Sequence, residues 1–211
     1  MNTITRIEDI LNAVANWIWG YPLIFLLLGT HIYLTIRLRF IQKKLPLAIK
    51  LSFSKESDDP GEVSHFGALS TALAATVGTG NIIGVATAIS LGGPGAVFWM
   101  WLTGVFGFAT KYAEAVLSIK FRVQNEKGEY VGGPMYVLER GLNSKLLGIA
   151  FAVFTVIASF GIGNMVQSNA ISNMVYEHTG ANLILTGSLL TLLTGMVIIG
   201  GIKSIAKFCT L

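Results

Sequence analysis

The chain has 211 residues, of which 53% are hydrophobic and 12% charged, with a mean hydropathy of +0.65 and a formal net charge of +4. Soluble domains carry about 25% charged residues, so this composition excludes an ordinary water-soluble protein. The single cysteine, Cys209, excludes an intramolecular disulfide and a CxxC metal or redox site.

The apolar residues fall into long runs, which predict an all-α membrane protein with one transmembrane domain over residues 1–211. About 20 helical residues cross the hydrocarbon core of a bilayer. The first run is too long for a signal peptide and basic residues follow it directly, so we expect it to stay in the membrane. Five spans are predicted, at about Trp17–Leu38, Phe66–Leu91, Ala96–Ser118, Gly148–Tyr176 and Asn182–Gly200.

Basic residues are concentrated in every second predicted connection between spans. Of the 15 basic residues, six lie in Arg37–Lys55, five in Lys120–Lys145 and two at Lys203 and Lys207, while the turns Gly92–Gly95 and Glu177–Ala181 hold none. Cytoplasmic loops are enriched in basic residues, so we expect the N-terminus outside and the C-terminus in the cytoplasm. Because this bias explains the positive charge, nucleic acid is not expected as a partner.

The second predicted span, FGALSTALAATVGTGNIIGVATAISL, is uncharged and has few bulky side chains. Its centre, Ala75–Asn81, holds two glycines, two threonines and an asparagine. Glycine costs about 1 kcal/mol relative to alanine inside a helix, and threonine adds a little, so the helix should break here. Unwound backbone in lipid needs new partners, and broken helices of transporters offer these groups to the transported solutes.

We therefore expect a sodium site at Ala75, Thr76 and Gly78, where freed carbonyls and the threonine hydroxyl supply oxygen ligands. The substrate carboxylate is expected at the N-terminal end of the outer half-helix. The residues predicted to bind it are Thr79, Gly80 and Asn81.

Other interpretations of this stretch stay open. Gly80 and Gly84 are spaced as in a close-packing face between helices, although that leaves Asn81 unexplained. A second alternative is that this stretch is a flexible helix that binds no ligand. A dinucleotide fingerprint is disfavoured because Ile83 stands where the third glycine is needed.

The fourth predicted span carries a polar stripe. Asn164, Ser168 and Ser172 recur at every fourth residue, with Gln167, Asn169 and Asn173 beside them. Such a stripe should face protein or water rather than lipid. We expect Gln167 and Asn169 to reach the substrate, and hydrogen bonding between helices is the alternative.

Two smaller features complete the pattern. Lys111 and Glu114 lie three residues apart, so we expect an ion pair that anchors the third span near the cytoplasmic surface, with ion coupling as the alternative. The segment Gly132–Gly141 predicts a short helix on the cytoplasmic face that begins at Pro134, a surface element or part of an inner gate. No nucleophile with its base, metal-ligand cluster or phosphate loop is present. We therefore expect neither an enzyme nor a cofactor.

The run GGPGAVFWMWLTGVFG, at Gly92–Gly107, resembles the signature of the alanine/glycine:cation symporter family. The blocks ATVGTGNIIGVA, ATKYAEAVL, GGPMYVLERG and GNMVQSNAIS resemble further blocks of that family in the same order. The resemblance covers Phe66 to Lys207. It implies a LeuT-type fold, in which one additional N-terminal helix precedes two inverted five-helix repeats.

The resemblance also implies sodium-coupled symport of alanine, glycine and, in some members, D-alanine across the bacterial plasma membrane. Family members are roughly twice as long, so the five predicted spans resemble the additional helix and the first four helices of the first repeat. We expect such a portion to be inactive alone. The alternative is a non-transporting membrane protein that packs with or regulates a full-length relative, and a small channel is disfavoured because no ring of pore-lining charges is seen.

Overall fold

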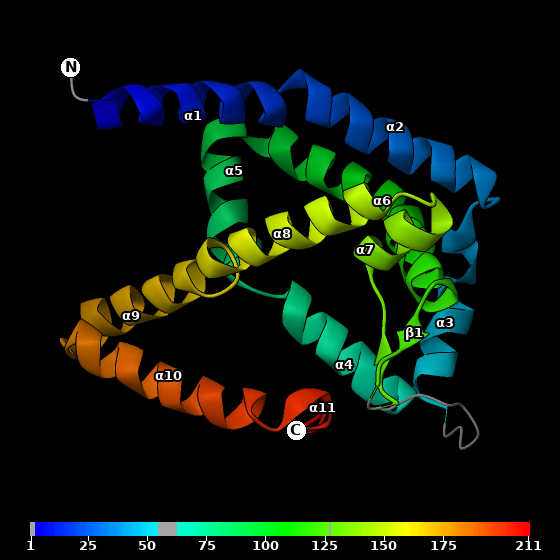
Figure 1. The fold of residues 1–211 in the computed structure, drawn as a ribbon. Helices are drawn as coiled ribbons and strands as arrows, with labels where there is room; N and C mark the ends of the chain where they lie inside the picture. The colour runs from blue at the N-terminus through cyan, green and yellow to red at the C-terminus, as the bar shows by residue number, and fades with distance from the viewer. Residues whose placement is uncertain (1–2, 55–62, 127) are drawn as a thin grey trace.

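The computed structural model describes residues 3–54, 63–126 and 128–211, and these are almost entirely helical (Figure 1). The first part comprises α1 (Thr3–Trp19), α2 (Tyr21–Arg37), the 3-10 helix η1 (Ile41–Lys44), α3 (Leu45–Ser52), α4 (His65–Thr76), the π-helix η2 (Gly80–Gly84), α5 (Val85–Gly92) and α6 (Pro94–Lys120). The second comprises β1 (Val123–Gln124), β2 (Tyr130–Val131), α7 (Pro134–Tyr136), the π-helix η3 (Val137–Gly141), α8 (Lys145–Gly161), α9 (Met165–Thr179), α10 (Leu183–Ile198) and α11 (Gly201–Cys209).

The helices account for part of the predicted span count. Within the described residues, two helical stretches are long and apolar enough to cross a membrane, Thr5–Arg37 and Lys145–Thr179. Two bent pairs also qualify if each is one span: α4 with the helix Gly80–Gly92, and α10 with α11. The 27-residue α6 coincides with the predicted third span but is not among the helices that qualify, and every 18-residue stretch of it contains Lys111. The chain is thus a multi-pass helical membrane protein, and the count of five spans stays a prediction.

The first helical stretch begins much earlier than the predicted span at Trp17. Helix α1 starts at Thr3 and meets α2 at Gly20. Its apolar residues Ile7, Ile10, Leu11 and Val14 recur at helical spacing, and its charged residues lie in the first half of the helix, as in an amphipathic helix. Because those charges lower the local hydropathy, the continuous apolar run in the sequence contains α2 but only the end of α1.

The connection between α6 and α8 contains both an expected and an unexpected element. A short helix begins at Pro134 and continues through η3 to Gly141, as predicted. The antiparallel pair β1–β2, which joins Val123 to Val131, was not predicted. Strands of two residues are too short to carry a recognisable alternation of polar and apolar side chains.

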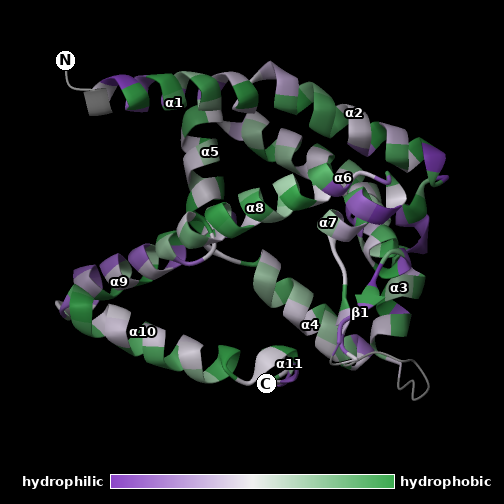
Figure 2. Cartoon of the chain, viewed as in Figure 1, coloured by the Kyte–Doolittle hydropathy of each residue, from purple (hydrophilic) through white to green (hydrophobic). Residues whose placement is uncertain are grey.

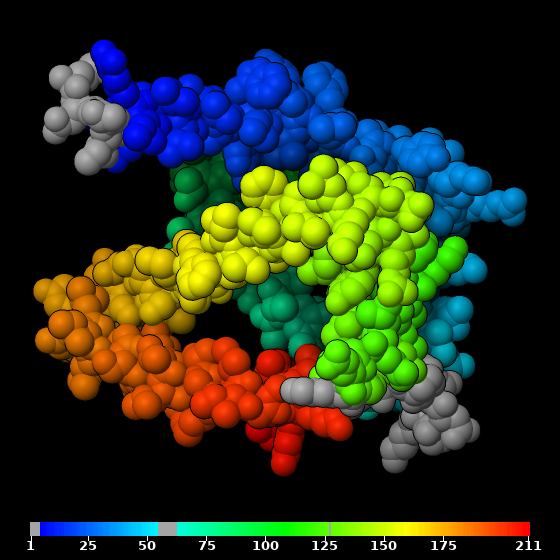
Figure 3. Space-filling model, in the orientation of Figure 1, coloured from blue at the N-terminus to red at the C-terminus, as the bar shows by residue number. Residues whose placement is uncertain are grey.

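Very little of the described chain is buried. The buried hydrophobic residues are Ala109 and Ala206, and the buried polar ones are His31, Thr35 and Ser172. The space-filling view shows an opening between the α8–α9 arm and the α10–α11 arm (Figure 3). Large apolar residues are exposed along most of the helices, and the hydropathy colouring shows apolar residues distributed over them (Figure 2), as expected where lipid or further helices replace water.

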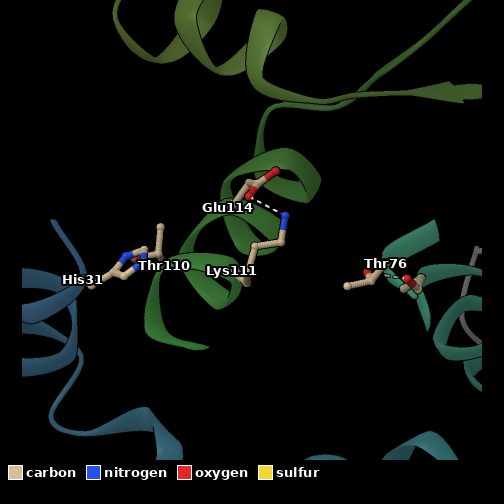
Figure 4. A network of polar contacts seen from close by, with 6 residues as sticks. His31, Thr76, Thr110, Lys111 and Glu114 are labelled. Atoms are coloured by element: carbon tan, nitrogen blue, oxygen red, sulfur yellow. Dashed lines mark hydrogen bonds and ion pairs between the residues drawn. The ribbon is translucent and has the colours of Figure 1, made fainter. Parts of the chain in front are cut away.

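The most extensive packing in the described chain joins α2 to α6, and polar groups lie inside it. A hydrogen bond of 2.7 Å joins His31 Nδ1 to Thr110 Oγ1 across 79 residues of sequence (Figure 4). Gln42 Nε2 donates to Thr35 Oγ1 at 3.1 Å and to the carbonyl oxygen of Val105 at 3.0 Å. These bonds attach α2 and η1 to α6, because buried polar groups in a membrane protein need such partners.

We expect replacement of Gly107 by alanine to destabilise the α2–α6 contact. A Cβ at Gly107 would lie 3.3 Å from Nε2 of His31. The imidazole cannot easily withdraw, since it is 9% exposed and held by Thr110. Overpacking of this kind costs about 1–3 kcal/mol, so the unfolding temperature in detergent should fall.

Gly104 provides the matched control on the same helix, because a Cβ there would meet nothing within 4 Å. Gly104→Ala should preserve or raise the unfolding temperature, since alanine favours the helix by about 1 kcal/mol. Equal unfolding temperatures for the two variants would contradict the packing described for His31.

Candidate functional site

The predicted break in the second span is present, and its position is as expected. Helix α4 ends at Thr76, and Val77 has extended backbone with φ −79° and ψ 113°. Helical backbone resumes at Thr79, one residue before the π-helix η2, and the two half-helices are bent by 55°. The last i→i−4 hydrogen bond of α4 runs from the Val77 N–H to the carbonyl oxygen of Leu73 at 2.8 Å. Residues 77 and 78 therefore interrupt the span.

The side chain of Asn81 closes back onto this break. Its Oδ1 accepts a hydrogen bond of 3.2 Å from the Gly78 N–H, while the Asn81 N–H donates to the Gly78 carbonyl at 3.0 Å. With Gly78 as the N-cap and Thr79 as the first helical residue, Asn81 is the third, and a third-residue side chain that accepts from the N-cap N–H is half of a capping box. The predicted substrate residue Asn81 thus uses one of its two oxygen lone pairs inside the chain.

Thr76, predicted to bind sodium, also has a partner within its own helix. Its hydroxyl donates to the carbonyl of Ala72 at 2.7 Å (Figure 4). Because the hydroxyl hydrogen is engaged, lone pairs of Oγ1 stay available as acceptors. Ala75 and Thr76 are exposed, whereas Gly78 and Thr79 are half-buried.

The glycines of the break do not pack closely against any described part of the chain. A Cβ at Gly78, Gly80 or Gly84 would meet nothing within 4 Å. The interpretation of Gly80 and Gly84 as a close-packing face therefore has no support among the described residues. Their effect here is to weaken the helix and to leave backbone accessible.

The polar stripe of the fourth span lies on α9 and faces α10. Ser172 is buried, and Gln167 and Ser168 are half-buried. Between the two helices lies a cleft of about 770 Å³, a size common for small-molecule sites. Its walls include Gln167, Asn169 and Thr191. Figure 2 shows polar residues along α9 opposite a more apolar α10.

Gln167 is the most informative residue of this cleft. Its side-chain oxygen Oε1 is buried and has no hydrogen-bond partner. A buried carbonyl oxygen without a donor costs about 1–3 kcal/mol, so this atom is suited to a ligand or to a further helix. Asn169, by contrast, accepts a bond of 3.0 Å from the side chain of Asn173.

The two predicted polar sets lie in different places in the described structure. Gln167 and Asn169 line the cleft between α9 and α10, whereas Thr79, Gly80 and Asn81 do not. Helix α9 packs mainly against α10, whereas η2 continues directly into α5. The predicted site is therefore divided between two regions of the described chain.

Thr191 and Thr194 were not predicted, yet both line the cleft. The signal for them is weak: two threonines three residues apart in an apolar span that also holds Gly187 and Gly195. The expected pair of Lys111 with Glu114 is confirmed at 2.8 Å (Figure 4). No cluster of metal-ligating His, Cys, Asp or Glu occurs in the portion of the chain that the structure describes.

The fold and the break define a multi-pass helical membrane protein with one discontinuous helix, an arrangement that secondary transporters use for binding. Residues 4–211 match the sodium:alanine symporter family, and the chain belongs to that family.

The relatives are named as transporters. The chain is 56% identical over 206 residues to "Sodium/alanine symporter AgcS" of Methanococcus maripaludis, an alignment that covers 94% of this chain and 46% of the relative. It is 52% identical to an uncharacterized transporter of Haemophilus influenzae, over 95% of this chain and 44% of that protein. It is 40% identical to "Probable sodium/glutamine symporter GlnT" of Bacillus subtilis, over 95% and 42% respectively. The chain thus spans about half the length of these relatives.

We expect Asn81→Ala to expose the backbone of the break. Without Oδ1, the Gly78 N–H loses its 3.2 Å partner, so its amide hydrogen should exchange faster with deuterated solvent. The measurement is hydrogen–deuterium exchange by mass spectrometry in detergent, comparing peptides that cover residues 77–81 and 65–74.

Asn81→Asp is the matched control, since a carboxylate keeps an acceptor oxygen at the same place. It should leave exchange over residues 77–81 close to that of the unmodified chain. Unchanged exchange in Asn81→Ala would show that the Asn81–Gly78 bond does not hold the break in solution.

Proposed function

We propose that the chain provides the broken-helix portion of a sodium-coupled symporter for small neutral amino acids, with alanine and glycine as the first substrates to test and D-alanine next. The observation that carries this proposal is the extended backbone at Val77 between two half-helices. It is supported by family membership and by relatives named as sodium/alanine and sodium/glutamine symporters.

In this proposal the two sides of the break have different roles. Carbonyl oxygens at Ala75 and Gly78, together with Oγ1 of Thr76, contribute to the sodium shell. The N-terminal end of the outer half-helix, at Thr79, Gly80 and Asn81, binds the substrate carboxylate. Sodium is the coupling ion, so no further cofactor is involved.

Gln167 and Asn169 contribute from the other polar region. The unpartnered Oε1 of Gln167 is an acceptor suited to the ammonium group of an amino acid. For both regions to meet one substrate, the α9–α10 unit and the break must come together in the assembled transporter. The relatives have about twice the length of this chain, so we propose that further helices complete this assembly.

A non-transporting role is the second candidate. The exposed cleft between α9 and α10 and the shortage of buried side chains both suit a chain that packs with a full-length relative. Co-purification of the chain with a relative, without uptake by any extended form, would favour this candidate.

We expect uptake only when further helices are supplied. The test compares this chain with a version extended by the remaining helices of a relative, both in proteoliposomes with an inward sodium gradient and labelled alanine or glycine. The extended chain should transport and the short chain should not, because sodium needs several oxygen ligands at once. Uptake by the short chain alone would refute this expectation and point to a dimer.

In the extended chain, Thr76→Val should raise the sodium concentration for half-maximal uptake about tenfold, the cost of one lost polar ligand. Thr87→Val is the matched control, because Thr87 makes the same bond to the carbonyl four residues earlier, at 2.8 Å. It lies beyond the break, on α5. Equal effects of the two substitutions would remove Thr76 from the proposed sodium site.

We propose that the N-terminus is outside and the C-terminus cytoplasmic, in the plasma membrane of a bacterium. Ser54–Glu62 and Asn125–Gly132 should then face the cytoplasm; residues 55–62 and 127 lie outside the described residues. In a Cys209→Ser background, single cysteines at Ser54 and Asn125 should resist a membrane-impermeant thiol reagent in intact cells. A cysteine at His178, in the opposite connection, should react. Labelling of Ser54 and Asn125 from outside would reverse the orientation.

A further inference from the structure

The chain turns sharply where α2 ends. Arg39 and Phe40 have positive φ angles of 53° and 58°, a conformation uncommon for residues other than glycine. After this corner, η1 and α3 run across the direction of α2 rather than along it (Figure 1). If α2 crosses the bilayer, α3 therefore lies along the membrane surface.

Gln42 attaches this corner to the rest of the molecule. Its side-chain amide donates hydrogen bonds to Thr35 on α2, which is 1% exposed, and to the carbonyl oxygen of Val105 on α6. Phe53 at the far end of α3 contacts the ring of Phe66 at the start of α4, with 5.4 Å between centroids. The segment is held at both ends, so its position relative to the predicted spans is defined.

Residues 37–54, here called the basic segment, combine positive charge with exposed apolar side chains. The basic residues Arg37, Arg39, Lys43, Lys44 and Lys50 are all exposed. Four apolar side chains of α3 are about half exposed: Leu45 and Ile49 lie one turn apart on one face, and Leu47 and Leu51 on the other. No acidic residue occurs between positions 37 and 54, and the next ones fall within 55–62, outside the described residues.

We propose that the basic segment is an interfacial element that binds the head groups of anionic phospholipids in the cytoplasmic leaflet. Clusters of four to eight basic residues directly after a membrane span bind such lipids, at about 1 kcal/mol per residue. Here Leu45 and Ile49, which lie one turn apart on one face of α3, enter the acyl boundary while the long lysine side chains extend to the phosphates. The proposal rests on the orientation given under the proposed function.

The apolar side chains of the basic segment distinguish between a soluble anion and an anionic phospholipid. A soluble anion such as inorganic phosphate would neutralise the lysines but leave Leu47, Ile49 and Leu51 in water. A phospholipid covers both kinds of side chain, and burial of apolar area favours it by about 25 cal/mol per Å². A lipid surface is therefore the partner to which both properties of the basic segment are complementary.

The experiment uses the whole chain in a neutral detergent, titrated with phosphatidylglycerol or phosphatidylcholine and followed by native mass spectrometry of retained lipid. The unmodified chain should retain phosphatidylglycerol in preference. K43Q/K44Q/K50Q should lower its apparent affinity about tenfold or more. K43R/K44R/K50R, which keeps the charge, should retain the preference.

The matched control, K145Q/K203Q/K207Q, removes three exposed lysines elsewhere on the predicted cytoplasmic side and should change the affinity far less. An equal loss in the control, no preference for phosphatidylglycerol, or displacement of the lipid by millimolar inorganic phosphate would each overturn the proposal. Because retained lipid is measured rather than uptake, these results are independent of whether the extended chain transports.

Discussion

The constraint on which this structure depends is that every backbone polar group inside a bilayer needs a partner. An unbroken helix meets this requirement by itself, and the segment from α4 to α5 does not. Its hydrogen-bond ladder stops at the bond from Val77 to Leu73 and restarts after Thr79. Asn81 supplies one replacement by accepting from Gly78. A break at this point is stable in lipid only if solutes or other helices supply the remaining hydrogen-bond partners of the backbone. This requirement is the physical reason why a weak helix can become a binding site.

The same constraint explains how the described helices hold together with so few buried apolar residues. Lipid is as apolar as leucine, so hydrophobic burial gives little preference for one helix pair over another. The pair with the most extensive packing, α2 and α6, is instead joined by polar groups from distant parts of the chain, His31 with Thr110 and Gln42 with Val105. Gly107 allows the imidazole to approach. Position is therefore determined by a few directional contacts rather than by a general apolar core.

The features that could be predicted from the sequence are those that depend on residues close together in the chain. The break was placed correctly because the weakness of Gly78, Thr79 and Gly80 in a helix belongs to those residues. The pair Lys111–Glu114 and the short helix from Pro134 were also local, and both are confirmed. The bond from His31 to Thr110 spans 79 residues, and Thr191 gains its position only when α10 folds against α9. No periodicity within one segment reports such contacts. Whether the predicted ligands bind together depends on the same long-range contacts.

In the proposed site, the Asn81–Gly78 bond is weak enough to be exchanged for a bond to the substrate carboxylate. The bond is 3.2 Å long and Asn81 is exposed, so its net contribution lies near the lower end of about 0.5–1.5 kcal/mol. A hydrogen bond to a charged group contributes about 1.5–3 kcal/mol, and the N-terminal end of the half-helix that continues into α5 adds to the attraction for an anion. A carboxylate can therefore replace Oδ1 at the Gly78 N–H with a net gain. The released amide oxygen of Asn81 then has both lone pairs free to accept from the substrate ammonium group or to coordinate sodium, so one exchange of partners would couple the two proposed halves of the site.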